Sequence, residues 1–90
     1  MNTLLISYDL IGPGRNYPRL KTFIESHEYW AKPLESLYLV KSNRSSESLL
    51  NEILKIIDSN DKAIVINVTK NMASWKGLPN DVSDWIQNNL

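Results

Sequence analysis

The stretch Leu4-Leu5-Ile6-Ser7-Tyr8-Asp9-Leu10-Ile11 decides the fold of this 90-residue chain. Apolar and β-branched residues fill it, and Gly12-Pro13-Gly14 follows, so it predicts a buried strand that ends in a turn. Side chains alternate between the two faces of a strand. The bulkier face, which is expected to meet the helices, carries Leu4, Ile6, Tyr8 and Leu10. The other face carries Leu5, Ser7, Asp9 and Ile11.

Asp9 is the unusual residue of this strand, because an ionised carboxylate rarely ends an apolar run unless something satisfies it. Two explanations stay open. The Asp9 carboxylate serves a site, or it accepts hydrogen bonds from backbone N–H groups of the loop that follows. Asp9 is therefore the first candidate for a catalytic or metal-ligating residue.

The middle of the chain predicts a helix and a hairpin. Pro18 suits the first turn of a helix that runs to about His27. Residues 29–41 are rich in good strand formers on both sides of a polar bend and predict two antiparallel strands. Pro33 places the first of these strands at a sheet edge, because proline cannot donate to a ladder.

The second half predicts a helix, a strand and a final helix. Ser45 or Ser46 caps the first of these helices, whose apolar stripe is Leu49, Leu50, Ile53, Leu54 and Ile57. Residues 62–68 form the strand, with Ala63, Val65 and Asn67 expected on the face opposite to the helices. Residues 70–77 predict a loop or a loose extra strand, and Asn80 or Asp81 caps the last helix.

The order β-α-β-β-α-β with a terminal helix is typical of an α+β, ferredoxin-like sandwich with an extra C-terminal helix. The length favours one domain, residues 1–90. In this fold both crossover helices cover one face of the sheet. The other face is too apolar to be solvated, so we expect a second copy or the C-terminal segment to cover it.

Composition narrows the class of protein. Lys plus Arg equals Asp plus Glu at 10 each, whereas a dedicated nucleic-acid binder usually carries a basic excess. The sequence has no cysteine, which excludes disulfides and thiolate chemistry. No segment approaches the length of a membrane span, and the N-terminus shows no leader pattern. A cytoplasmic protein is therefore expected.

These features resemble a known family. The chain has a strand ending in Tyr8-Asp9, a loop, a helix opening near Arg19 and a hairpin whose second arm starts at Ser36. In these features it is similar to the small CRISPR-associated spacer-acquisition protein. The chain resembles in particular the short relatives labelled SinR-family, which also have a tryptophan-containing loop and a terminal helix, here residues 75–90. Virulence-associated protein D toxins belong to the same superfamily.

The resemblance implies a homodimer through the sheet faces, in which the Asp9 carboxylates of two subunits share Mg²⁺. It implies a metal-dependent endoribonuclease acting on RNA or DNA, or a CRISPR-associated-like dimer that binds a partner without catalysis. In this fold the loop after the first strand lies beside Asp9, so Arg15 and Arg19 are the candidate nucleic-acid contacts. The neutral charge and the Glu28-Tyr29-Trp30-Ala31 hairpin depart from the CRISPR proteins and count against DNA bridging.

Other motifs have a structural and a functional interpretation. The segment 12–15 is a plain turn, or it offers backbone N–H groups to a phosphate. The cluster 58–61 lacks the glycine and distal glutamate of a calcium loop and predicts a turn. His27, the only histidine, suits a helix end better than catalysis. Tryptophans stack bases in some proteins but more often pack in cores.

A third function remains open, because this fold serves many purposes. A small-molecule regulatory domain is expected to have an apolar pocket lined by Tyr29, Trp30 or Trp75. A nuclease is expected to expose Asp9 at a dimer junction.

Overall fold

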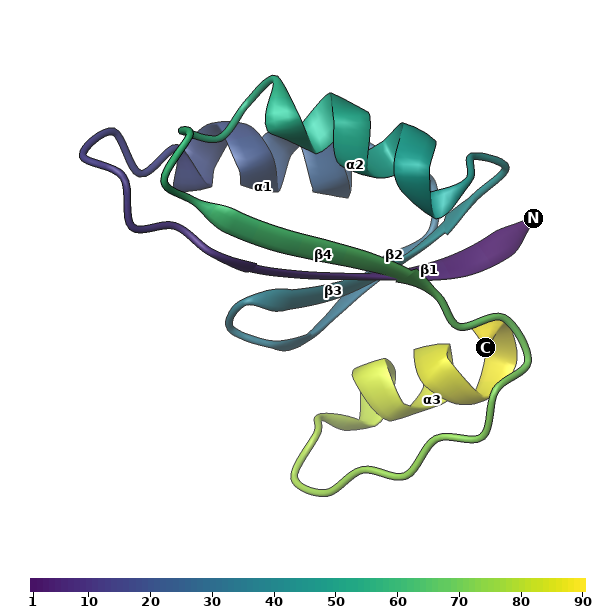
Figure 1. Cartoon of the computed structure of the whole chain (residues 1–90). Helices are drawn as coiled ribbons and strands as arrows, with labels where there is room; N and C mark the ends of the chain where they lie inside the picture. The colour runs from purple at the N-terminus through teal and green to yellow at the C-terminus, as the bar shows by residue number, and fades with distance from the viewer.

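The computed structural model describes residues 1–90. Along the chain it contains β1 (Asn2–Asp9), α1 (Tyr17–Glu25), β2 (Trp30–Leu34), β3 (Leu37–Ser42), α2 (Ser46–Leu54), β4 (Lys62–Asn67) and α3 (Asn80–Asn89). The strands form one antiparallel sheet in the order β2-β3-β1-β4. Both crossovers pass over the same face, and α3 lies against the other (Figure 1). The predicted ferredoxin-like α+β fold with an extra C-terminal helix is confirmed.

The core lies between the sheet and the two crossover helices. The β1 residues Leu4, Ile6 and Tyr8 are buried there, as the alternation of the first strand predicts. They meet apolar side chains of α1, β3 and α2, namely Leu20, Ile24, Tyr38, Val40, Leu49 and Ile53. The edge position predicted from Pro33 is also found, since β2 is the outermost strand and its pairing is irregular between Ala31 and Leu34.

The buried apolar stripe of helix α2 contains fewer residues than the sequence predicts. Ser45 caps it as expected, because the Ser45 hydroxyl accepts a hydrogen bond from Ser48 N. Leu49 and Ile53 are fully buried, but Leu54 is 54% exposed. Leu54 lies about 140° around the helix from Leu49 and therefore points away from the sheet.

The face of strand β4 that packs against the core is the opposite of the one that the sequence predicts. Ala63 and Val65 pack against the core, whereas Ile64 and Ile66 lie on the face away from α1 and α2. The reason is register: Val65 pairs with the core residue Ile6. Both faces of β4 are apolar, so alternation alone does not identify the inner one.

The C-terminal segment covers part of the face opposite to α1 and α2. Ile86 of α3 is buried, and Asn89 O accepts hydrogen bonds from Thr3 Oγ1 and from Lys41 Nζ, the latter at 3.1 Å. Residues 70–77 form a loop with no strand, and Pro79 occupies the cap position before Asn80, the first residue of α3. The face near β4 stays uncovered. None of the helices is long and apolar enough to span a membrane.

Candidate functional site

Asp9 is the last residue of β1, and its side chain is exposed on the uncovered side of the sheet. The three ion pairs of the chain lie elsewhere, and no loop N–H group donates to the Asp9 carboxylate. Both carboxylate oxygens are therefore available to a ligand outside the chain.

The surroundings of Asp9 form a small, polar hollow. A pocket of about 190 Å³ is lined by six residues of β1 and β4, namely Ser7, Tyr8, Asp9, Lys62, Ala63 and Ile64. Asp9 is paired across the strands with Lys62, and Ser7 is paired with Ile64. The sheet thus makes Ser7, Asp9 and Lys62 neighbours on one face, and no ion pair joins Asp9 to Lys62.

One carboxylate is an incomplete site for a divalent cation. No group of three or more metal-ligating side chains exists in the chain. Mg²⁺ needs only one or two carboxylates, because it keeps several water ligands. The donor chemistry of Asp9 fits Mg²⁺ if a second molecule supplies the other carboxylate.

The loop after β1 is held by two other carboxylates, which the sequence did not predict. Asp61 Oδ1 accepts hydrogen bonds from Ile11 N and Gly12 N, both at 2.7 Å, and Asp61 Oδ2 accepts one from Asp58 N at 2.8 Å. Asp58 Oδ2 accepts a hydrogen bond from Gly14 N at 3.2 Å. The hydrogen bonds that Asp61 accepts, first from Gly12 N and then from Asp58 N and Ile11 N, hold the pKa of Asp61 below its ordinary value.

The hydrogen bonds between residues 58–61 and 11–14 decide between the alternatives that the sequence left open for Asp9 and for the loop 12–15. Asp61 and Asp58 perform the loop-capping role considered for Asp9, so Asp9 is not needed for it. The N–H groups of Gly12 and Gly14 are already bonded, so the loop backbone does not form a phosphate cradle. The turn predicted at 58–61 is confirmed.

The candidate nucleic-acid contacts, Arg15 and Arg19, are both exposed but do not line the pocket of Asp9. Arg15 has a φ of 35°, and its charge contributes to the lowered pKa of Asp61. Arg19 lies in the first turn of α1 and forms no ion pair. Figure 1 shows the loop that carries Arg15 projecting beyond the end of the sheet at which β1 stops.

His27 and the tryptophans have structural contacts. His27 Nδ1 lies 2.8 Å from Ile24 O at the end of α1, which is consistent with the predicted helix-end role. Trp30 packs edge-on against Tyr38, on the helix side of the sheet. Trp75 lies on the opposite side, where its Nε1 donates to Ser83 Oγ. Trp30 and Trp75 therefore do not form one base-stacking surface.

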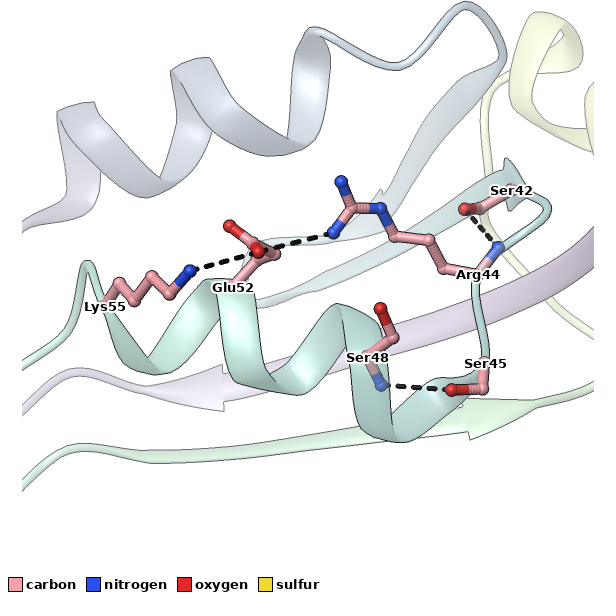
Figure 2. A network of polar contacts seen from close by, with 6 residues as sticks. All are labelled: Ser42, Arg44, Ser45, Ser48, Glu52 and Lys55. Carbon is pink, nitrogen blue, oxygen red and sulfur yellow. Dashed lines mark hydrogen bonds and ion pairs between the residues drawn. The ribbon is translucent and has the colours of Figure 1, made fainter.

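The serine-rich segment before α2 uses two of its hydroxyl groups in backbone hydrogen bonds (Figure 2). Ser42 Oγ and Ser45 Oγ accept hydrogen bonds from backbone N–H groups, and no histidine accompanies them. Glu52 lies between Lys55 and Arg44, at 3.2 and 3.6 Å, and the Lys55 hydrogen bond is the main cause of its lowered pKa. These exposed pairs stabilise the helix only slightly.

Comparisons with protein-family models, with curated proteins and with solved structures find no match to this chain. The geometry around Asp9 is therefore the basis for inferring a function.

Proposed function

We propose that this protein is a homodimer that binds a divalent cation between two Asp9 carboxylates and cleaves RNA or DNA as a CRISPR-associated-like endoribonuclease of the cytoplasm. The observation that carries the proposal is the position of Asp9. Its carboxylate is exposed and has no partner within the chain. It lies at the edge of the uncovered apolar strip that Ile64 and Ile66 of β4 form.

The dimer is supported by the exposed side chains of β4. Ile64 and Ile66 are 52% and 44% exposed and lie on the same face as Asp9. A two-fold contact buries the same patch on both subunits and brings each residue near the axis close to its own copy. An axis that passes near the end of β1 pairs the two Asp9 residues and covers both isoleucines.

The residues of this strip suit phosphodiester chemistry. A bound Mg²⁺ supplies charge stabilisation and a more acidic water. The Asp9 carboxylate holds the cation, and the hydroxyl of Ser7, on the same face, orients a water molecule. The ammonium group of Lys62 attracts the phosphate, while Arg15 and Arg19 contact the nucleic acid farther along its backbone.

The test is cleavage of labelled single-stranded RNA and double-stranded DNA with Mg²⁺ or Mn²⁺. Asp9→Asn is expected to abolish cleavage and to keep the dimer mass in light scattering, because it changes a ligand and not the apolar strip. Asp84→Asn, an exposed carboxylate of α3, is the matched control and should cleave normally. Equal activity in wild type and Asp9→Asn would remove Asp9 as the metal ligand.

A second function, a non-catalytic dimer that binds a protein or nucleic acid, has its own supporting observation. Each chain offers only one carboxylate at the site, and Lys62 is its cross-strand neighbour. Such a module is expected to form the dimer and to cleave neither substrate with either metal. Ile66→Lys should separate the subunits in both cases.

A further inference from the structure

A second hollow lies on the same side of the sheet as Asp9 but is lined by different residues. It has a volume of about 470 Å³ and is mostly apolar. Leu5, Leu37 and Leu39 of the sheet form its base. Ile86 and Leu90 of the C-terminal segment and residues 71–76 also line it.

Residues 68–78, the strap, connect β4 to α3, and residues 71–76 of the strap belong to the lining of this hollow. One end of the strap is held by the hydrogen bond from Lys70 N to Leu90 O at 2.7 Å, and the other by Trp75 Nε1 to Ser83 Oγ at 3.0 Å. Positive φ angles of 60° and 80° occur at Lys70 and Gly77. Residues 71–77 are exposed, so this segment has little packing of its own.

The helix α3 does not fill the hollow. Ile86 is the only buried residue of α3, although the helix lies against an apolar sheet face. A hollow of this size is within the range of about 300–1,000 Å³ that is usual for small-molecule sites. An apolar pocket lined by Trp75 is also what the sequence predicts for a small-molecule regulatory domain, although Tyr29 and Trp30 do not line it.

The polar groups of the hollow indicate the chemistry of its ligand. Lys76 is the only ionisable side chain in the lining, and Asn71 and Ser74 are the other polar ones. No ion pair engages Lys76 within the chain. All three come from the strap, whereas the opposite surface of leucines is apolar.

We propose that this hollow binds a small amphipathic anion, with an aliphatic body against Leu37 and Leu39 and a single carboxylate near Lys76. A medium-chain fatty acid has this chemistry. The Asp9 pocket shares no residue with the hollow, so this inference is independent of the proposed nuclease.

The test is a titration of the ¹⁵N-labelled protein with decanoate, followed by amide and indole N–H chemical shifts. We expect saturable binding below the micelle concentration, with shifts at Leu39, Ile86 and the Trp75 indole. Decanol, which has the same chain without the charge, should bind about fivefold more weakly because it lacks the contact with Lys76.

Two variants and one control locate the site. Ala73→Phe adds a large side chain to the exposed strap without changing the core, and it should weaken decanoate binding about tenfold or more. Lys76→Gln should weaken decanoate about fivefold and leave decanol unchanged. Ile64→Ala, on the same face outside the hollow, should bind normally.

Three results would overturn the proposal. The first is the absence of saturable shifts below the micelle concentration. The second is equal weakening by Ile64→Ala and Ala73→Phe, which would place the ligand on the uncovered strip. The third is a change of the Leu39, Ile86 and Trp75 signals with protein concentration in the absence of ligand, because the hollow itself would then receive a second copy of the chain.

Discussion

A Cβ atom on Gly12 would lie 2.7 Å from the Cβ of Asp58, closer than real side chains approach one another. The close approach brings the loop after β1 against the turn before β4. It allows Asp58 and Asp61 to accept hydrogen bonds from the backbone of that loop.

Gly12→Ala is therefore expected to lower the free energy of unfolding by about 1–3 kcal/mol, the usual cost of overpacking a well-filled site. Gly14→Ala is the matched control. Its Cβ would lie 3.1 Å from Asp58 Oδ2, at the movable end of the side chain, so its effect should be smaller. Urea unfolding of the two variants measures the difference, and equal effects would contradict the contact.

Asp61→Asn should lower the melting temperature at pH 7. Asp61 uses both carboxylate oxygens as acceptors, so an amide must turn its NH₂ group toward one of the donors, Asp58 N or the pair Ile11 N and Gly12 N. The measurement is thermal unfolding of the variant and wild type at matched pH.

The effect of Asp61→Asn should also depend on pH. The folded pKa of Asp61 is lowered, so its contribution to stability is complete above the unfolded pKa of about 3.9 and is lost as the pH falls through the folded pKa. The difference in melting temperature between wild type and variant should therefore shrink from pH 7 to pH 3. A constant difference would mean that the charge of Asp61 does not matter.

Tyr38→Phe should destabilise the protein by about 1 kcal/mol at pH 7 because it removes one hydrogen bond. The Tyr38 hydroxyl donates to Glu25 Oε2 at 2.7 Å, and the tyrosine is fully buried. Tyr29→Phe, an exposed tyrosine, is the control and should change stability little. Chemical unfolding of both variants provides the comparison.

Tyr38 should also make the wild type sensitive to alkali. Burial first, and the Glu25 carboxylate second, raise the pKa of Tyr38 well above its usual value. Its contribution is complete below the unfolded pKa of about 10 and is lost as the pH rises toward the folded pKa. Stability between pH 9 and 11 should therefore fall more steeply in wild type than in Tyr38→Phe, and identical slopes would contradict the shift.

The buried side of α2 is tested by two adjacent residues. Ile53→Ala should cost about 2–5 kcal/mol because it leaves a cavity in the core. Leu54→Ala should change stability by less than about 0.5 kcal/mol because Leu54 lies on the solvent side. A large loss of stability in Leu54→Ala would contradict the exposed position of Leu54 and support the wider apolar stripe that the sequence predicts.

The face reversal of β4 is tested in the same way. Val65→Lys should lower the free energy of unfolding by at least about 2 kcal/mol, because it places a charge against the core. Ile66→Lys should leave the monomer fold stable to within about 0.5 kcal/mol. Circular dichroism at increasing urea distinguishes them, and the reverse order would support the face assignment made from alternation.

The sequence by itself determined the order of the elements and the inner face of β1. It did so because helical and strand periodicities, Pro18, Pro33 and the Ser45 cap are local signals that act within a few residues. The ferredoxin-like topology follows from that order, since few arrangements bury the apolar faces of such a chain with short connections. The position of Asp9 at the end of β1 was predictable for the same reason, whereas the exposure of its carboxylate was not.

Only the tertiary structure decided which face of β4 is inside, which carboxylates hold the loop after β1, and where a hollow remains. Val65 turns inward because of its register with Ile6 on the neighbouring strand. Asp61 accepts a hydrogen bond from Gly12 N although the two residues are 49 positions apart in the sequence. Such contacts join distant parts of the chain, and they exist only once the sheet has brought the end of β1 beside the start of β4. No local pattern of residues can therefore predict them.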